Sequence, residues 1–169
     1  MKRVSVLLFL AFALFIRCSE DKIDREEPKS TILTVKTTFK DNEVHPYGQV
    51  YIYDASENQL KDVYYPLDGI TIGKISDVDG KIVRPIATER LHDNTNPNGS
   101  TDDYSYAMFN LDKVIYYSEK TKGNIFIVIV LSNTEKYTYK TIQWEKKQTI
   151  EISKQFDGEY PKLSFEEWH

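Results

Sequence analysis

The chain has 169 residues, of which 40% are hydrophobic and 28% are charged, and its formal net charge at pH 7 is −4. A chain of about 150 residues fits one domain and buries about 68–70% of its unfolded surface, so it needs no disulfides for stability. The acidic balance argues against a nucleic-acid-binding protein, which needs a clustered basic surface, and against a polybasic membrane contact.

The first 17 residues have the pattern of an export signal. Lys2 and Arg3 precede an apolar run of 13 residues, Val4 to Ile16. A membrane-spanning helix needs about 20 residues, whereas the apolar region of a signal peptide has about 7–15. The run also lacks the polar face, at a period of 3.6 residues, that a surface helix of a folded domain shows. We therefore expect residues 1–17 to be a signal peptide that is removed.

Cys18 is the only cysteine, and it directly follows this segment. Its position resembles the lipobox of bacterial lipoproteins, with Phe15, Ile16 and Arg17 standing where that motif has a leucine and small residues. Relaxed lipoboxes of this kind are familiar in Bacteroides-type lipoproteins. The resemblance implies that Cys18 is lipidated and becomes the first residue of the mature protein. The alternative is a cysteine without such a role that merely belongs to the signal.

A short acidic run follows the cysteine. Ser19, Glu20 and Asp21 resemble the export signal that places Bacteroides-type lipoproteins on the outer face of the outer membrane. The resemblance implies a lipid-anchored protein that faces the exterior. Residues 18–30 are strongly charged and contain Pro28 and a single aliphatic residue, so we expect a disordered tether. From Cys18 onward, 19 basic residues stand against 26 acidic ones, which gives a net charge of −7.

Alternating apolar and polar residues predict β strands from Thr31 onward. Leu33, Val35, Thr37 and Phe39 share one face of the first strand, expected at 31–39. Further strands of the first half are expected at 48–54, 63–65, 70–75 and 81–88.

A turn separates the last two of these strands. The run from Asp77 to Gly80 is typical of a hairpin turn in which glycine takes a positive φ. Pro85 interrupts the following strand, so we expect that strand to lie at a sheet edge or to contain a bulge there.

The second half repeats the pattern. A strand is expected at 104–111, and the seven-residue apolar run Ile125–Leu131 lies within a strand at 124–131 that should be central and covered on both faces. Strands at 137–144 and 148–156 are expected to form a terminal hairpin around the turn at 145–147.

Eight or nine short strands without a long amphipathic helix predict an all-β fold. We expect residues 31–169 to form one antiparallel two-sheet sandwich of about 7–9 strands. The runs at 48–54, 79–81 and 123–130 resemble the transthyretin-like or carboxypeptidase-regulatory-like sandwich. An immunoglobulin-like sandwich that lacks its disulfide would have nearly the same sequence pattern. The resemblance implies accessory or adhesive roles more often than catalysis.

The residue types that usually perform acid–base or nucleophilic catalysis do not form a known catalytic motif in this sequence. His45, His92 and His169 lie at no spacing typical of metal ligands. The sequence has no Gly-x-Ser-x-Gly, Ser-x-x-Lys or phosphate-binding glycine loop. We therefore expect that the chain is not an enzyme and has no cofactor. A small hydrolase is the least favoured alternative.

Two groups of carboxylates are candidate cation sites. Asp77 and Asp79 before Gly80 resemble the start of a calcium loop, but the twelfth position is Thr88 rather than glutamate. A plain hairpin turn explains these residues better. A second group lies around the polar loop 93–103 and includes Asp93, Asp102 and Asp103. Such loops are usually only solvated, so we expect no metal site.

Tyrosine is the most suggestive residue type, with 12 in the chain. Exposed tyrosines on a rigid sheet supply contact area at a small entropy cost. The alternative is that they merely reflect the strand preference of tyrosine. By alternation, the candidates for ligand contact are Tyr51, Tyr53, Tyr104, Tyr106, Tyr137 and Tyr139.

These observations lead to an expected function. The leading hypothesis is a non-catalytic, lipid-anchored protein of the cell surface whose sandwich binds a protein or a glycan. Its partners would be the membrane, through the lipid, and that ligand, but no nucleic acid. The alternative is a structural or assembly subunit of an outer-membrane surface complex, in which an edge strand pairs with a partner strand.

Overall fold

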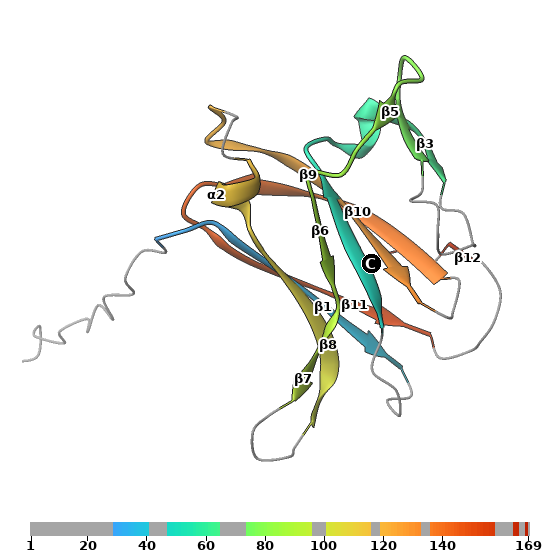
Figure 1. Cartoon of the computed structure of the whole chain (residues 1–169), viewed down its shortest axis with the longest axis vertical. Helices are drawn as coiled ribbons and strands as arrows, with labels where there is room; N and C mark the ends of the chain where they lie inside the picture. Colours follow the sequence, from blue (N-terminus) through green and yellow to red (C-terminus); the bar gives the residue numbers. More distant parts are fainter. Residues whose placement is uncertain are drawn as a thin grey trace, which may run out of the picture.

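The structure is a computed structural model (Figure 1). It describes residues 29–40, 47–64, 74–95, 101–115, 119–132, 136–157, 164–165 and 168. The predicted signal peptide, Cys18, the acidic run Ser19–Asp21 and the tether up to residue 28 lie outside the described residues, as do His45 and His169.

The described elements are nearly all strands, which confirms the all-β prediction. Two short helical segments are present in this part of the chain, η1 (Glu57–Gln59) and α2 (Leu111–Val114). No helix among the described residues is long and apolar enough to cross a membrane. The strands are β1 (Ile32–Phe39), β2 (Gly48–Tyr53), β3 (Leu60–Tyr64), β4 (Lys74–Asp77), β5 (Ile82–Val83), β6 (Ala87–Arg90), β7 (His92–Thr95), β8 (Thr101–Asn110), β9 (Lys122–Leu131), β10 (Lys136–Glu145), β11 (Thr149–Phe156) and β12 (Ser164–Phe165).

Two sheets face each other and enclose the main core (Figure 1). The first sheet has the order β11-β1-β8-β7, and the second has the order β12-β10-β9-β2-β6. In β1 every second residue is buried, so Leu33, Val35 and Phe39 point into the core as predicted. Isoleucines of β9 meet them from the other sheet. Burial of apolar side chains between the sheets is therefore the main force that holds the sandwich together.

Strand β9 is the centre of the second sheet, between β10 and β2. Its residues from Ile125 to Ile129 are all buried. Ile125, Ile127 and Ile129 join the main core, while Phe126 and Val128 belong to a second apolar cluster on the opposite face. The prediction of a central strand covered on both faces is confirmed.

The second cluster exists because a third, three-stranded sheet, β3-β4-β5, covers part of the outer face of the second sheet. Ile75 of β4 is fully buried there against Tyr53 and Phe126. The predicted turn joins β4 to β5, with Gly80 at a φ of 80°. The Asp77 carboxylate accepts hydrogen bonds from the backbone N–H groups of Asp79 and Lys81, at 3.0 and 2.8 Å.

Two expected strand arrangements are wrong. The expected strand 81–88 is split at Pro85, which lacks a backbone N–H group: β5 stays in the third sheet and β6 joins the second. The expected terminal hairpin does not form, since β10 and β11 lie in different sheets. Instead, β11 pairs in parallel with β1, in a register that runs from Ile32–Thr149 to Phe39–Phe156. This arrangement places the apolar faces of β10 and β11 opposite each other, across the core.

Candidate functional site

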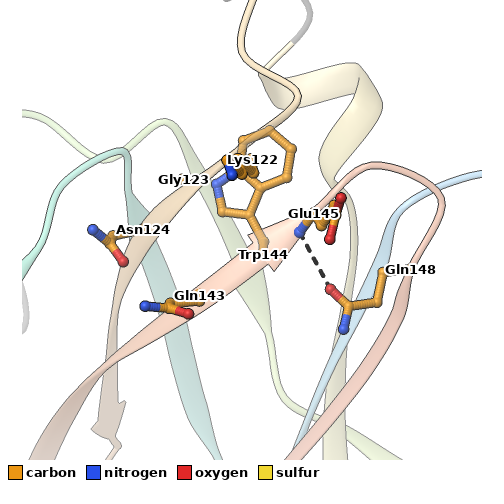
Figure 2. A pocket seen from close by; sticks show the side chains of 7 residues that line it. All are labelled: Lys122, Gly123, Asn124, Gln143, Trp144, Glu145 and Gln148. Atoms are coloured by element: carbon orange, nitrogen blue, oxygen red, sulfur yellow. Dashed lines mark hydrogen bonds between the residues drawn. The ribbon is translucent and has the colours of Figure 1, made fainter.

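A groove of about 650 Å³ lies at one end of the sandwich, where β9 begins and β10 ends (Figure 2). Its size falls within the range of small-ligand sites, about 300–1,000 Å³. The lining residues come from β9, from β10 and from the turn that follows β10. They are Lys122, Gly123, Asn124, Gln143, Trp144, Glu145 and Gln148.

The antiparallel register of β9 and β10 brings these residues together. Asn124 lies directly opposite Gln143, Gly123 opposite Trp144, and Lys122 opposite Glu145. Because side chains alternate along a strand, Asn124 and Gln143 share the outer face of the sheet, whereas Trp144 points to the core side. Figure 2 shows the two amide side chains next to each other, with Gln148 on the other side of Trp144.

Trp144 forms the wall of the groove on the core side. Its side chain is only 3% exposed and packs in the main core. The indole Nε1 is buried and has no hydrogen-bond partner. A buried donor without a partner loses about 1–3 kcal/mol in solvation, so this N–H group lowers the stability of the fold.

Gln148 is held by the turn between β10 and β11. Its Oε1 atom accepts a hydrogen bond from the backbone N–H of Glu145, at 3.2 Å (Figure 2). This bond uses the carbonyl oxygen of the amide and leaves its NH2 group as a donor. The side chains of Asn124, Gln143 and Gln148 are all exposed.

The chemistry of the groove suits a ligand with many hydroxyl groups. Each carboxamide has N–H donors and a carbonyl acceptor, and each hydroxyl has one O–H donor and an oxygen that accepts. In a hydrogen bond between the two groups, either group can therefore be the donor. Lys122 and Glu145 add one charge of each sign at the rim. The predicted strand 137–144 ends at Trp144, but nothing in the sequence pattern marks Trp144 as a binding residue. The pairing of two amides depends on the β9–β10 register, which alternation alone does not give.

The predicted ligand-contact tyrosines divide between different surfaces. Tyr53 is fully buried in the second cluster, with its ring centroid 6.1 Å from that of Phe126. The expectation that Tyr53 is exposed is wrong, because the third sheet covers the outer face on which Tyr53 lies. Tyr51 is half-buried beside the same cluster and donates a hydrogen bond from its hydroxyl to Gln49 Oε1. Burial raises the pKa of the Tyr51 phenol above its usual value of 10.

Tyr137 and Tyr139 are also half-buried at the edge of the second cluster. The Tyr139 ring lies 5.2 Å from that of Phe126. Its pKa is raised, first by burial and then by the negative charge of Glu57 and by Tyr137. These two side chains therefore serve as packing groups for the covering sheet.

Tyr104 and Tyr106 lie on the outer face of the first sheet, far from the other four in topology. Lys36 Nζ lies 4.8 Å above the Tyr104 ring and 2.7 Å from the Glu151 carboxylate. His92 forms a cross-strand ring contact with Tyr106, at 6.2 Å. The six tyrosines thus form no single patch.

The predicted carboxylate groups are accounted for by local structure where they are described. The Asp77 turn is held by its own backbone bonds, as above. Asp93 accepts hydrogen bonds from Ser105 at 3.2 Å and from Tyr47 at 3.4 Å. The side chains of Asp102 and Asp103 lie outside the described set. Within that set, no group of three His, Cys, Asp or Glu side chains is placed to hold a metal ion.

No protein-family model, curated protein or solved structure matches this chain. The lipoprotein and transthyretin-like resemblances therefore stay predictions from the sequence.

Proposed function

We propose that this chain is a non-catalytic, lipid-anchored protein of the cell surface that binds a glycan through the groove beside Trp144. The observation that carries the glycan assignment is that three carboxamides, from Asn124, Gln143 and Gln148, line one groove beside Trp144. Sugar hydroxyls both donate and accept hydrogen bonds, which matches this set of groups.

The anchor rests on the N-terminal pattern. Cys18 follows a 13-residue apolar run and precedes Ser19, Glu20 and Asp21. Lipidation there would hold the sandwich at the outer face of the outer membrane, where glycans are within reach. A sandwich built from two packed sheets gives such a groove a rigid frame.

The alternative, assembly through an edge strand, has less support. The open edges of β10 and β11 lie on the same side, and the C-terminal segment contacts both of them. β12 pairs with β10 at Lys136 and Tyr137, and Trp168 Nε1 donates to the Ser153 carbonyl of β11 at 2.9 Å. A partner strand on this side of the sandwich would have to compete with these contacts.

Glycan binding is tested with a glycan array probed by the full chain and by an Asn124→Ala/Gln143→Ala variant. Both side chains are exposed, so the double variant should fold and lose binding. The matched control is Thr149→Ala/Gln155→Ala, which removes two exposed polar side chains from β11 and should keep binding. Array binding that survives the loss of both amides would refute the assignment.

The anchor is tested separately with Cys18→Ala. We expect this variant to lose acyl labelling and to leave the outer-membrane fraction. Unchanged labelling and fractionation would show that the cysteine carries no lipid.

A further inference from the structure

A second pocket, of about 310 Å³, shares the lining residue Trp144 with the groove. Its apolar wall is formed by Leu111, Ile115 and Trp144, all of them buried. Its rim carries three exposed lysines, Lys29, Lys146 and Lys147. We infer that this pocket binds the head group and upper acyl chain of an anionic membrane phospholipid, which orients the anchored domain on the membrane.

The lining carries more positive than negative charge, with three lysines against the one carboxylate of Asp112. None of the three lysines forms an ion pair with another described residue. Asp112 is the one acidic residue of the lining, and both its carboxylate oxygens accept hydrogen bonds from Thr31, each at 2.9 Å. Three ammonium groups over an apolar wall match an anionic head group joined to a hydrocarbon chain.

The turn that presents two of these lysines is held firmly. Lys147 has a φ of 58°, a left-handed conformation that costs a residue with a Cβ atom about 1–2 kcal/mol. Its backbone N–H donates to Thr31 Oγ1 at 2.9 Å, and the N–H of Lys146 donates to the Thr121 carbonyl at 2.8 Å. A glycine would adopt this conformation more easily, so the lysine occupies the position at an energetic cost.

The pocket also lies where the chain enters the sandwich. Lys29 is eleven residues from Cys18, a segment that spans at most roughly 40 Å when fully extended. If Cys18 carries a lipid, as proposed above, this end of the domain stays near the lipid surface. The net charge of −7 had argued against a basic membrane contact, but the pocket gathers positive charge locally.

The inference is tested with the full acylated chain in vesicles whose lipids carry brominated acyl chains. A Trp168→Phe background leaves Trp144 as the single tryptophan, because the chain has two. We expect Trp144 fluorescence to be quenched in vesicles that contain phosphatidylglycerol and to be quenched less in pure phosphatidylcholine. Equal quenching in both vesicle types would overturn the inference.

The decisive variant is Lys146→Gln/Lys147→Gly, which removes two charges and relieves the positive φ. We expect the ratio of docked to undocked domain to fall about fivefold for each lysine lost. The matched control is Lys40→Gln/Lys81→Gln, which neutralises two exposed lysines away from the pocket and should behave as the parent. A double variant that docks like the parent, or a control that loses as much, would also overturn the inference.

Acyl labelling separates the two proposals. A chain that is labelled at Cys18 but shows no dependence on the head group refutes the lipid pocket alone. A chain that is not labelled refutes the anchor. It also refutes the lipid pocket, which rests on that anchor.

Discussion

The indole ring of Trp144 lies against Gly123 of the neighbouring strand, and a Cβ atom at position 123 would come within 3.1 Å of the indole Nε1. The missing side chain at Gly123 lets the large ring close the end of the core. Trp144 also lines both the groove that carries the three carboxamides and the pocket that the lysines rim. One residue therefore has a structural role and borders both proposed sites.

Substitutions of Trp144 should separate these roles. Trp144→Phe keeps an aromatic ring in the core and removes only a buried N–H group that has no partner, so we expect the free energy of unfolding to change by less than about 1.5 kcal/mol and glycan-array binding to be kept. Trp144→Ala should lower the free energy of unfolding by about 3–5 kcal/mol. Urea denaturation measures both effects. Loss of array binding by a Trp144→Phe protein that is as stable as the parent would contradict the buried position of the indole N–H.

Gly48 is a second position at which the sheet requires glycine. A Cβ atom there would lie 2.2 Å from the backbone carbonyl oxygen of Val130, on the neighbouring strand β9. Since backbone cannot swing away as a side chain can, Gly48→Ala should lower the free energy of unfolding by about 1–3 kcal/mol. Gly123→Ala is the matched comparison and should cost less, because its closest contact is a side chain. Equal stability of Gly48→Ala and the parent in urea would contradict the register of β2 and β9.

Tyr51 should make stability depend on alkaline pH. Its folded-state pKa is raised by burial, so the neutral phenol is favoured in the folded protein. The contribution of this group is complete below its unfolded pKa, near 10, and is lost as the pH rises through the folded value. The parent should therefore lose stability above about pH 10 more steeply than Tyr51→Phe. Urea unfolding between pH 8 and pH 11 measures this, and parallel curves for the two proteins would refute it.

Much of the sandwich could be predicted because burial leaves a local pattern in the sequence. The alternation in β1 marks a half-buried strand, and the seven-residue apolar run in β9 marks one covered on both sides. Alternation gives the two faces of a strand but not its neighbours. The parallel pairing of β11 with β1 therefore had no signal, and adjacency in the chain suggested a hairpin instead.

The wrong prediction for Tyr53, which was expected to be exposed, has a related cause. Its alternation with Ile52 is correct, but the face it occupies is covered by a third sheet built from short segments around Ile75. No property of residues 48–54 indicates that another sheet packs on this face. The carboxamide groove was missed for the same kind of reason, since Asn124 and Gln143 become a pair only through the β9–β10 register.

The contact of Trp168 with β11 leads to the last prediction. Trp168 packs against the main core, donates to the Ser153 carbonyl at 2.9 Å, and lies 5.8 Å from Lys140 Nζ of β10. It thereby joins the edges of the two sheets. Edge strands with free backbone groups are sites of association between copies, so this contact protects the edge as well as the core.

Trp168→Ala should remove both the packing against the core and the protection of the β11 edge. We expect the free energy of unfolding to fall by about 1–3 kcal/mol, from lost packing and a lost hydrogen bond. Self-association should also increase in sedimentation velocity runs, because the β11 edge is exposed. Trp168→Phe is the control: it keeps most of the packing, loses only the hydrogen bond, and should cost about 1 kcal/mol with little self-association. A Trp168→Ala protein that is as stable and as monomeric as the parent would show that this side of the sandwich needs no cover.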